Sequence, residues 1–106
     1  MSTVVYTAFD GTVTTIAGRV GDSVMETAVR NGVPGIVGEC GGSLSCATCH
    51  VFAAPATFAE VGGPGDLEDE MLYGTAVDRE DTSRLSCQIA LTEGCEYHVT
   101  TPREQL

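Results

Sequence analysis

The stretch that decides the fold reads Cys40-Gly41-Gly42-Ser43-Leu44-Ser45-Cys46-Ala47-Thr48-Cys49, and it holds three cysteines within ten residues. Five residues separate the first two thiols, and two residues separate the second from the third. Cys87 lies alone beyond an acidic segment, with 37 residues between it and the loop. Nearly every residue between the thiols is small, so the backbone can approach a compact group closely. Four thiolates so spaced predict a metal site, and the question is which metal it holds.

Size and charge limit the interpretation. A chain of 106 residues can build one modest core, so we expect a single domain over residues 1–106. Fifteen acids face five arginines and no lysine, which argues against nucleic acid or an anionic membrane as partner. No apolar run approaches the roughly 20 residues of a membrane span, and no targeting pattern precedes the first strand. We therefore expect a cytoplasmic protein that meets partners through their positive patches, with cysteines used for metal rather than disulfides.

The predicted elements run strand, strand, helix, strand, helix, strand, strand, which is an α+β fold with a mixed sheet and a packed helix. Asp10-Gly11 predicts a two-residue turn between the first two strands, and residues 55–65 are predicted to be irregular. The predicted strands and helices cover residues 4–9, 12–17, 23–30, 51–53, 66–73, 85–91 and 95–100.

Local patterns support the helices and the last strand. Ser23 and Glu26 form a capping-box pattern, and Asn31-Gly32 predicts the end of that helix. The inward stripes are predicted to be Val24, Met25, Ala28 and Val29 on the first helix and Leu67, Met71 and Leu72 on the second. Strict alternation predicts that Cys95, Tyr97 and Val99 point inward, and that Glu96, His98 and Thr100 point outward.

The arrangement of the thiols favours iron and sulfide over zinc. Structural zinc sites usually combine two Cys-x₂-Cys pairs, whereas this chain has one such pair, a third cysteine in the same loop and a distant fourth. Three thiols in one loop and one on a later segment are typical of [2Fe-2S] ferredoxins. Amide groups of the small loop residues could point at the cluster sulfurs and stabilise their negative charge. A Cys₄ zinc-stabilised binding module is the alternative.

Three other residues could take part in redox or metal chemistry. Cys95 is expected to be a buried, inert thiol, the alternative being a substitute ligand or a site of oxidation. His50 could replace a ligand as in Rieske centres, but four cysteines in register favour a hydrogen-bonding role instead. His98 is expected to lie on the outward face without a special role.

Three motifs resemble the vertebrate/bacterial-type [2Fe-2S] ferredoxins, the adrenodoxin/putidaredoxin family. They are Cys-Ala-Thr-Cys-His-Val at 46–51 after the Cys-x₅-Cys gap, Glu-Asp-Glu-Met-Leu at 68–72, and Ser-Arg-Leu-Ser-Cys-Gln at 83–88. The resemblance implies a β-grasp fold and a one-electron carrier that an FAD-containing, NAD(P)H-dependent ferredoxin reductase reduces. It also implies one [2Fe-2S] cluster per chain, with the ligands Cys40, Cys46, Cys49 and Cys87.

The same resemblance suggests roles for residues around the cluster. His50 and Arg84 match positions that tie the cluster loop to the rest of the protein, and we expect a network of these two residues with Glu68. Seven acids and one base lie between residues 66 and 81, a one-signed run that could steer transient, electrostatic complexes. The expected docking residues are Glu39, Asp66, Glu68, Asp69 and Glu70.

These features predict an electron-transfer protein rather than an enzyme, because the sequence shows no general acid/base constellation. The favoured acceptor is a cytochrome P-450 monooxygenase. A ferredoxin of iron–sulfur cluster assembly is the alternative within the same family, although the segment after Val99 lacks the longer histidine-bearing tail associated with that branch.

Overall fold

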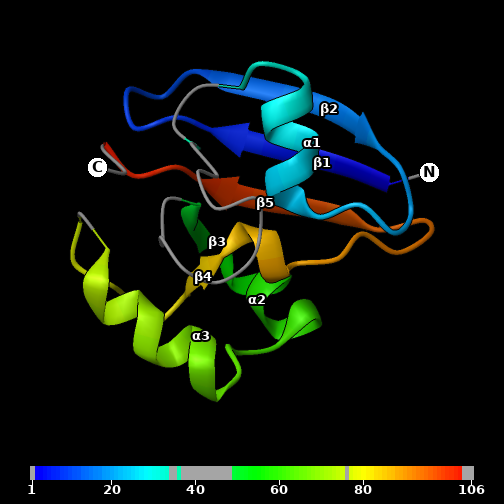
Figure 1. Cartoon of the computed structure of the whole chain (residues 1–106). Coiled ribbons are helices and arrows are strands. Elements are labelled where there is room, and N and C mark those ends of the chain that lie inside the picture. Colours follow the sequence, from blue (N-terminus) through cyan, green and yellow to red (C-terminus); the bar gives the residue numbers. More distant parts are fainter. Residues whose placement is uncertain (1, 34–35, 37–48, 76, 104–106) are drawn as a thin grey trace.

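One five-stranded mixed sheet organises the protein (Figure 1). The computed structural model describes residues 2–33, 36, 49–75 and 77–103. The strand order is β2-β1-β5-β3-β4, with β1 and β5 parallel and the other neighbours antiparallel. The strands are β1 (Ser2–Thr7), β2 (Val13–Gly18), β3 (His50–Ala53), β4 (Ser83–Leu85) and β5 (Glu96–Thr100).

The first hairpin is confirmed, but its connection is longer than the predicted two-residue turn. The register pairs Thr7 with Val13, so five residues join the strands. The amide of Ala8 donates to the carbonyl of Thr12, and the Asp10 carboxylate accepts from the Thr12 amide at 3.0 Å. Gly11 has a φ of 94°, a conformation in which a residue without Cβ is favoured.

Helix α1 (Val24–Arg30) begins and ends as predicted. Ser23 accepts a hydrogen bond from the Glu26 amide while the Glu26 carboxylate accepts from the Ser23 amide, which completes the capping box. Val24, Met25 and Ala28 are buried, but Val29 is 49% exposed, so its predicted inward position is wrong. Thr27 is buried instead, and its hydroxyl donates to the Ser23 carbonyl.

The segment before the acidic run is a helix, where the sequence had predicted irregular structure. Helix α2 covers Pro55–Val61, and Pro55 occupies its first turn, where the missing amide hydrogen costs no hydrogen bond. Helix α3 (Asp66–Met71) follows and continues into the 3-10 helix η1 (Leu72–Gly74). Leu72 is fully buried, whereas Leu67 is 57% exposed, so the predicted inward position of Leu67 is wrong.

The predicted strand over residues 85–91 is also wrong. Strand β4 ends at Leu85, and the 3-10 helix η2 (Ser86–Gln88) carries Cys87. The alternation in β5 is confirmed, with Tyr97 and Val99 buried and the residues between them exposed. In Figure 1, α1 lies over the β1–β2 side of the sheet, and α2 and α3 lie toward β3 and β4. Among the described residues, no helix has the length and apolar character needed to cross a membrane.

Candidate metal centre

Two of the four predicted ligands lie side by side. Cys49 immediately precedes β3 and is 2% exposed, and Cys87 is partly buried in η2. The pKa of the Cys49 thiol is raised, first by a hydrogen bond with the Cys87 side chain and then by burial. The fold therefore brings the loop end and the distant cysteine into direct contact. Cys40, Cys46 and Glu39 lie outside the described residues.

Ser86 explains why these two cysteines meet. Its amide donates to the carbonyl of Cys49 at 2.9 Å, and its hydroxyl donates to the same oxygen at 2.7 Å. The antiparallel register of β3 and β4 pairs His50 with Leu85, directly before these bonds. Two donors on one carbonyl fix the start of η2 against the end of the cysteine loop, so the sheet register itself sets the position of Cys87.

This donor set fits an iron–sulfur group. Thiolates are the soft ligands that such clusters require, and here two thiols are already in contact. The side-chain amide of Gln88 also donates to Cys87 Sγ at 3.4 Å. Hydrogen bonds to sulfur stabilise the negative charge of a thiolate and help to set the reduction potential.

A buried ion pair supports η2 from the side. Arg84 Nε donates to Glu68 Oε2 at 2.6 Å and Arg84 Nη2 donates to Glu68 Oε1 at 3.1 Å, with the two residues only 5% and 4% exposed. Glu68 Oε2 also accepts from the Leu85 amide at 2.9 Å. Arg84 Nη1 donates to the carbonyl of Gly62, and Nη2 lies 3.5 Å from the carbonyl of Gln88. One side-chain pair thus connects α3, the end of α2, β4 and η2.

His50 is hydrogen-bonded to a residue that sequence reasoning missed. His50 Nε2 lies 2.8 Å from Ser83 Oγ, and that hydroxyl also accepts from the Glu80 amide. Burial, and next the charge of Arg79, lowers the pKa of His50 to about 4, so the ring is neutral at pH 7. The predicted Glu68–Arg84 contact is present, and His50 is linked to the same strand through Ser83. A serine next to an arginine in a short strand gives no sequence signal for this role.

The predicted docking acids differ in their surroundings. Asp66 and Glu70 are exposed, whereas Asp69 forms an ion pair with Arg79 at 2.9 Å. Glu68 was predicted to contact a partner, but its carboxylate is buried against Arg84 and is not presented at the surface. The reason is helical geometry, because the side chain of Glu68 points inward while its acidic neighbours point outward.

The two remaining candidates are Cys95, directly before β5, and His98, within it. Cys95 was predicted to be buried, but it is only partly buried because it lies at the turn before β5, where its Sγ is 3.1 Å from Thr92 Oγ1. His98 is exposed as predicted, and its Nε2 lies 2.6 Å from the Glu96 carboxylate.

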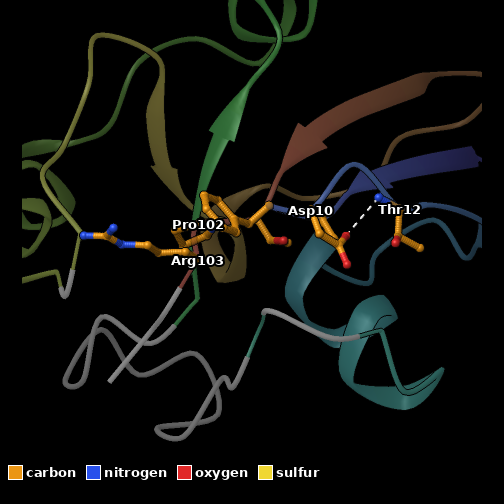
Figure 2. A pocket seen from close by; sticks show the side chains of 7 residues that line it. Asp10, Thr12, Pro102 and Arg103 are labelled. Carbon is orange, nitrogen blue, oxygen red and sulfur yellow. Dashed lines mark hydrogen bonds between the residues drawn. The ribbon is translucent and has the colours of Figure 1, made fainter.

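A shallow cavity of about 260 Å³ lies between the β1–β2 connection and the C-terminal segment (Figure 2). Its lining includes Asp10, Pro102 and Arg103, and Figure 2 shows Arg103 extending from Pro102 away from Asp10. The Asp10 carboxylate accepts hydrogen bonds from Thr12, which lowers its pKa. The acid and the base of this cavity therefore do not form a pair.

Comparison with known proteins places the chain in a family. Residues 8–92 match the family described as the 2Fe-2S iron-sulfur cluster binding domain. Rhodocoxin of Rhodococcus erythropolis is 39% identical, and the match covers 100% of each chain. Putidaredoxin of Pseudomonas putida is 45% identical, and the match covers 87% of this chain and 86% of that protein.

Solved structures agree with this assignment. A ferredoxin from Rhodopseudomonas palustris HaA2 superposes with a TM-score of 0.94 at 36% identity, and the match covers 98% of this chain and 99% of that one. Putidaredoxin in its covalent complex with putidaredoxin reductase gives a TM-score of 0.87 at 42% identity, with coverage of 94% and 97%.

These matches confirm the predicted β-grasp fold and the predicted cofactor, one [2Fe-2S] cluster. They also confirm that the protein transfers electrons and is not an enzyme. The chain belongs to the 2Fe-2S iron-sulfur cluster binding domain family, as a putidaredoxin-like ferredoxin.

Proposed function

We propose that this ferredoxin carries single electrons from an FAD-containing, NAD(P)H-dependent ferredoxin reductase to a cytochrome P-450 monooxygenase. The cluster supplies a centre that accepts and releases one electron when it is bound. The protein holds that centre, limits its contact with water and presents a surface to each partner in turn.

The ligand set of the proposal is Cys40, Cys46, Cys49 and Cys87. The observation that carries it is the contact between the Cys49 and Cys87 thiols, which are separated by 37 residues in the sequence. Ser86 fixes this contact by donating twice to the Cys49 carbonyl. A cysteine pair held by the backbone needs little rearrangement to coordinate a compact group.

The supporting residues of the proposal are Arg84 and His50. Arg84 donates to two carboxylate oxygens of Glu68 and to the carbonyl of Gly62, so it connects the segment before α3 with the strand that leads to Cys87. His50 follows Cys49 directly and bonds Ser83 on the neighbouring strand. Both side chains therefore restrain the two ends of the Cys49–Cys87 contact.

Two observations support the reductase as partner: the negative charge of this chain and the solved complex of a related protein. Asp66 and Glu70 lie exposed on α3, within a molecule of formal net charge −10, and such a surface attracts a partner with a cationic patch. A solved complex joins putidaredoxin to putidaredoxin reductase, and that putidaredoxin is 42% identical to this chain.

The monooxygenase, as electron acceptor, is supported by sequence similarity alone. An ISC-like [2Fe-2S] ferredoxin from Pseudomonas putida shares only the fold at 24% identity, whereas the redoxins named above are 39% and 45% identical. The stronger likeness to the redoxins favours an electron-transfer chain over cluster assembly.

Reconstituted turnover tests both partners. The holoprotein is combined with a reductase and with a P-450 of the same host, and NAD(P)H oxidation and product formation are followed as the ferredoxin concentration rises. We expect saturable product formation that depends on the ferredoxin. Reduction by the reductase without any product from the host's P-450 enzymes would contradict the monooxygenase role and leave the reductase role standing.

A further inference from the structure

One aromatic side chain stands out on the acidic side of the molecule. Tyr73 lies in η1, directly after α3, and is 76% exposed. Single exposed apolar side chains are common on protein surfaces, so exposure alone assigns no role to this ring, and its contacts and surroundings have to be considered. Neither the cluster ligands nor the Glu68–Arg84 pair accounts for its position.

The ring of Tyr73 is held rather than loose. The guanidinium carbon of Arg79 lies 4.8 Å from the ring centroid, a cation–π contact. Arg79 Nη1 in turn donates to the Asp69 carbonyl at 3.0 Å and lies 2.9 Å from Asp69 Oδ1. The Asp69–Arg79–Tyr73 chain fixes one side of the ring, so less conformational entropy remains to be lost when a partner covers it.

Two acids of this region are paired with arginines, and the others remain exposed. Arg79 offsets the charge of Asp69, and Arg84 offsets that of Glu68. Asp66 and Glu70 stay exposed on α3, as do Asp78, Glu80 and Asp81 beyond it. Tyr73 therefore belongs to a segment in which the exposed charged side chains that the structure describes are carboxylates.

We propose that Tyr73 is the apolar anchor through which the chain binds its reductase, by inserting into an apolar pocket whose rim carries lysine or arginine. This inference rests on the reductase role proposed above. Tyrosine is frequent among the side chains that dominate binding energy, whereas exposed charges mainly raise the association rate. Tyr73 should then govern how long the complex lasts, and Glu70 should govern how fast it forms.

The experiment uses holoprotein and the FAD-containing ferredoxin reductase of the same host, with association and dissociation rates measured at low and high salt. For Tyr73→Ala we expect dissociation to accelerate roughly tenfold at both salt concentrations. For Tyr73→Phe we expect a change of about twofold at most, because the ring remains. Val29→Ala removes a half-exposed apolar side chain from α1 and should leave both rates unchanged. Glu70→Gln should slow association at low salt only.

The outcomes separate this inference from the one on which it depends. If wild-type protein is reduced and Tyr73→Ala dissociates like wild type, the anchor is excluded and the reductase role stands. If Tyr73→Ala loses affinity only at low salt, its effect is electrostatic and the anchor is likewise excluded. If the wild-type protein neither binds nor is reduced, the reductase role fails and the inference fails with it. Unchanged visible absorption and thermal midpoint of each variant establish that the fold and the cluster are intact.

Discussion

The two ends of this sheet are held together in different ways. At the β1–β2–α1 end, a regular hairpin ladder and a complete capping box satisfy the backbone. At the β3–β4 end the strands are short, and side chains such as Arg84, Glu68 and Ser86 bind backbone groups directly. The first arrangement gives general stability. The second positions Cys87 against Cys49, so changes there should affect the cluster first.

The largest effect is expected from Arg84→Ala. The change leaves the carboxylate of Glu68 buried without its cation, which costs about 3–5 kcal/mol when one partner of a buried pair is removed. We expect weakened cluster retention as well as lower stability, measured by visible absorption over time and by denaturant unfolding. Arg79→Ala is the matched control, since Arg79 pairs with the half-exposed Asp69. Unchanged cluster retention in Arg84→Ala would contradict the supporting role of Arg84.

Tyr6→Phe probes the other end. The hydroxyl of Tyr6 donates to the carbonyl of Val24 at 2.6 Å, and both residues are buried. Removing the donor should lower the free energy of unfolding by about 1–2 kcal/mol, because the buried carbonyl loses a partner. The visible spectrum of the folded holoprotein should not change. A variant that loses its cluster while remaining folded would show that contacts at the β1–β2–α1 end also determine cluster binding.

Ser23→Ala removes the cap of α1 and should cost about 1 kcal/mol. The Glu26 amide loses its acceptor, while the reciprocal bond from the Ser23 amide to the Glu26 carboxylate can remain. Denaturant unfolding measures the loss, and the reduction potential should stay at the wild-type value. A shifted potential would mean that α1 is coupled to the cluster environment.

The smallest effect is expected from Glu70→Gln, which removes an exposed charge and leaves the fold intact. Association with the reductase should slow by roughly threefold at low salt and approach the wild-type rate at high salt. Stopped-flow reduction at two ionic strengths measures this. Glu93→Gln, on the turn before β5, is the control for a general loss of negative charge.

Sequence reasoning succeeded where the local signal and the tertiary structure agree. The capping box at Ser23 and the alternation from Glu96 to Thr100 each have one structural solution, and both appear in the fold. The irregular structure predicted for residues 55–65 was inferred from Pro64 and three glycines, but α2 ends at Val61, before all four of them. Pro55 fits this helix because proline can occupy a first turn.

Tertiary contacts decided the remaining features. The strand expected at 85–91 stops at Leu85 because Ser86 turns to bind the Cys49 carbonyl, a contact between residues far apart in sequence. Glu68 was predicted both to contact Arg84 and, with its acidic neighbours, to dock a partner, and its burial against Arg84 leaves only the first role. The role of Ser83 likewise depends on a distant partner, His50, and the position of the Tyr73 ring depends on its contact with Arg79.

The central claim is that Cys87 completes the cluster site with Cys49, and one comparison tests it most directly. Visible absorption and the paramagnetic signal after dithionite reduction are recorded for wild type, Cys87→Ser and Cys95→Ser, all reconstituted anaerobically with iron and sulfide. The account predicts that Cys95→Ser matches wild type, and that Cys87→Ser loses the cluster or shows shifted absorption bands and an altered paramagnetic signal. A Cys87→Ser protein with wild-type spectra, or a Cys95→Ser protein without a cluster, would contradict it.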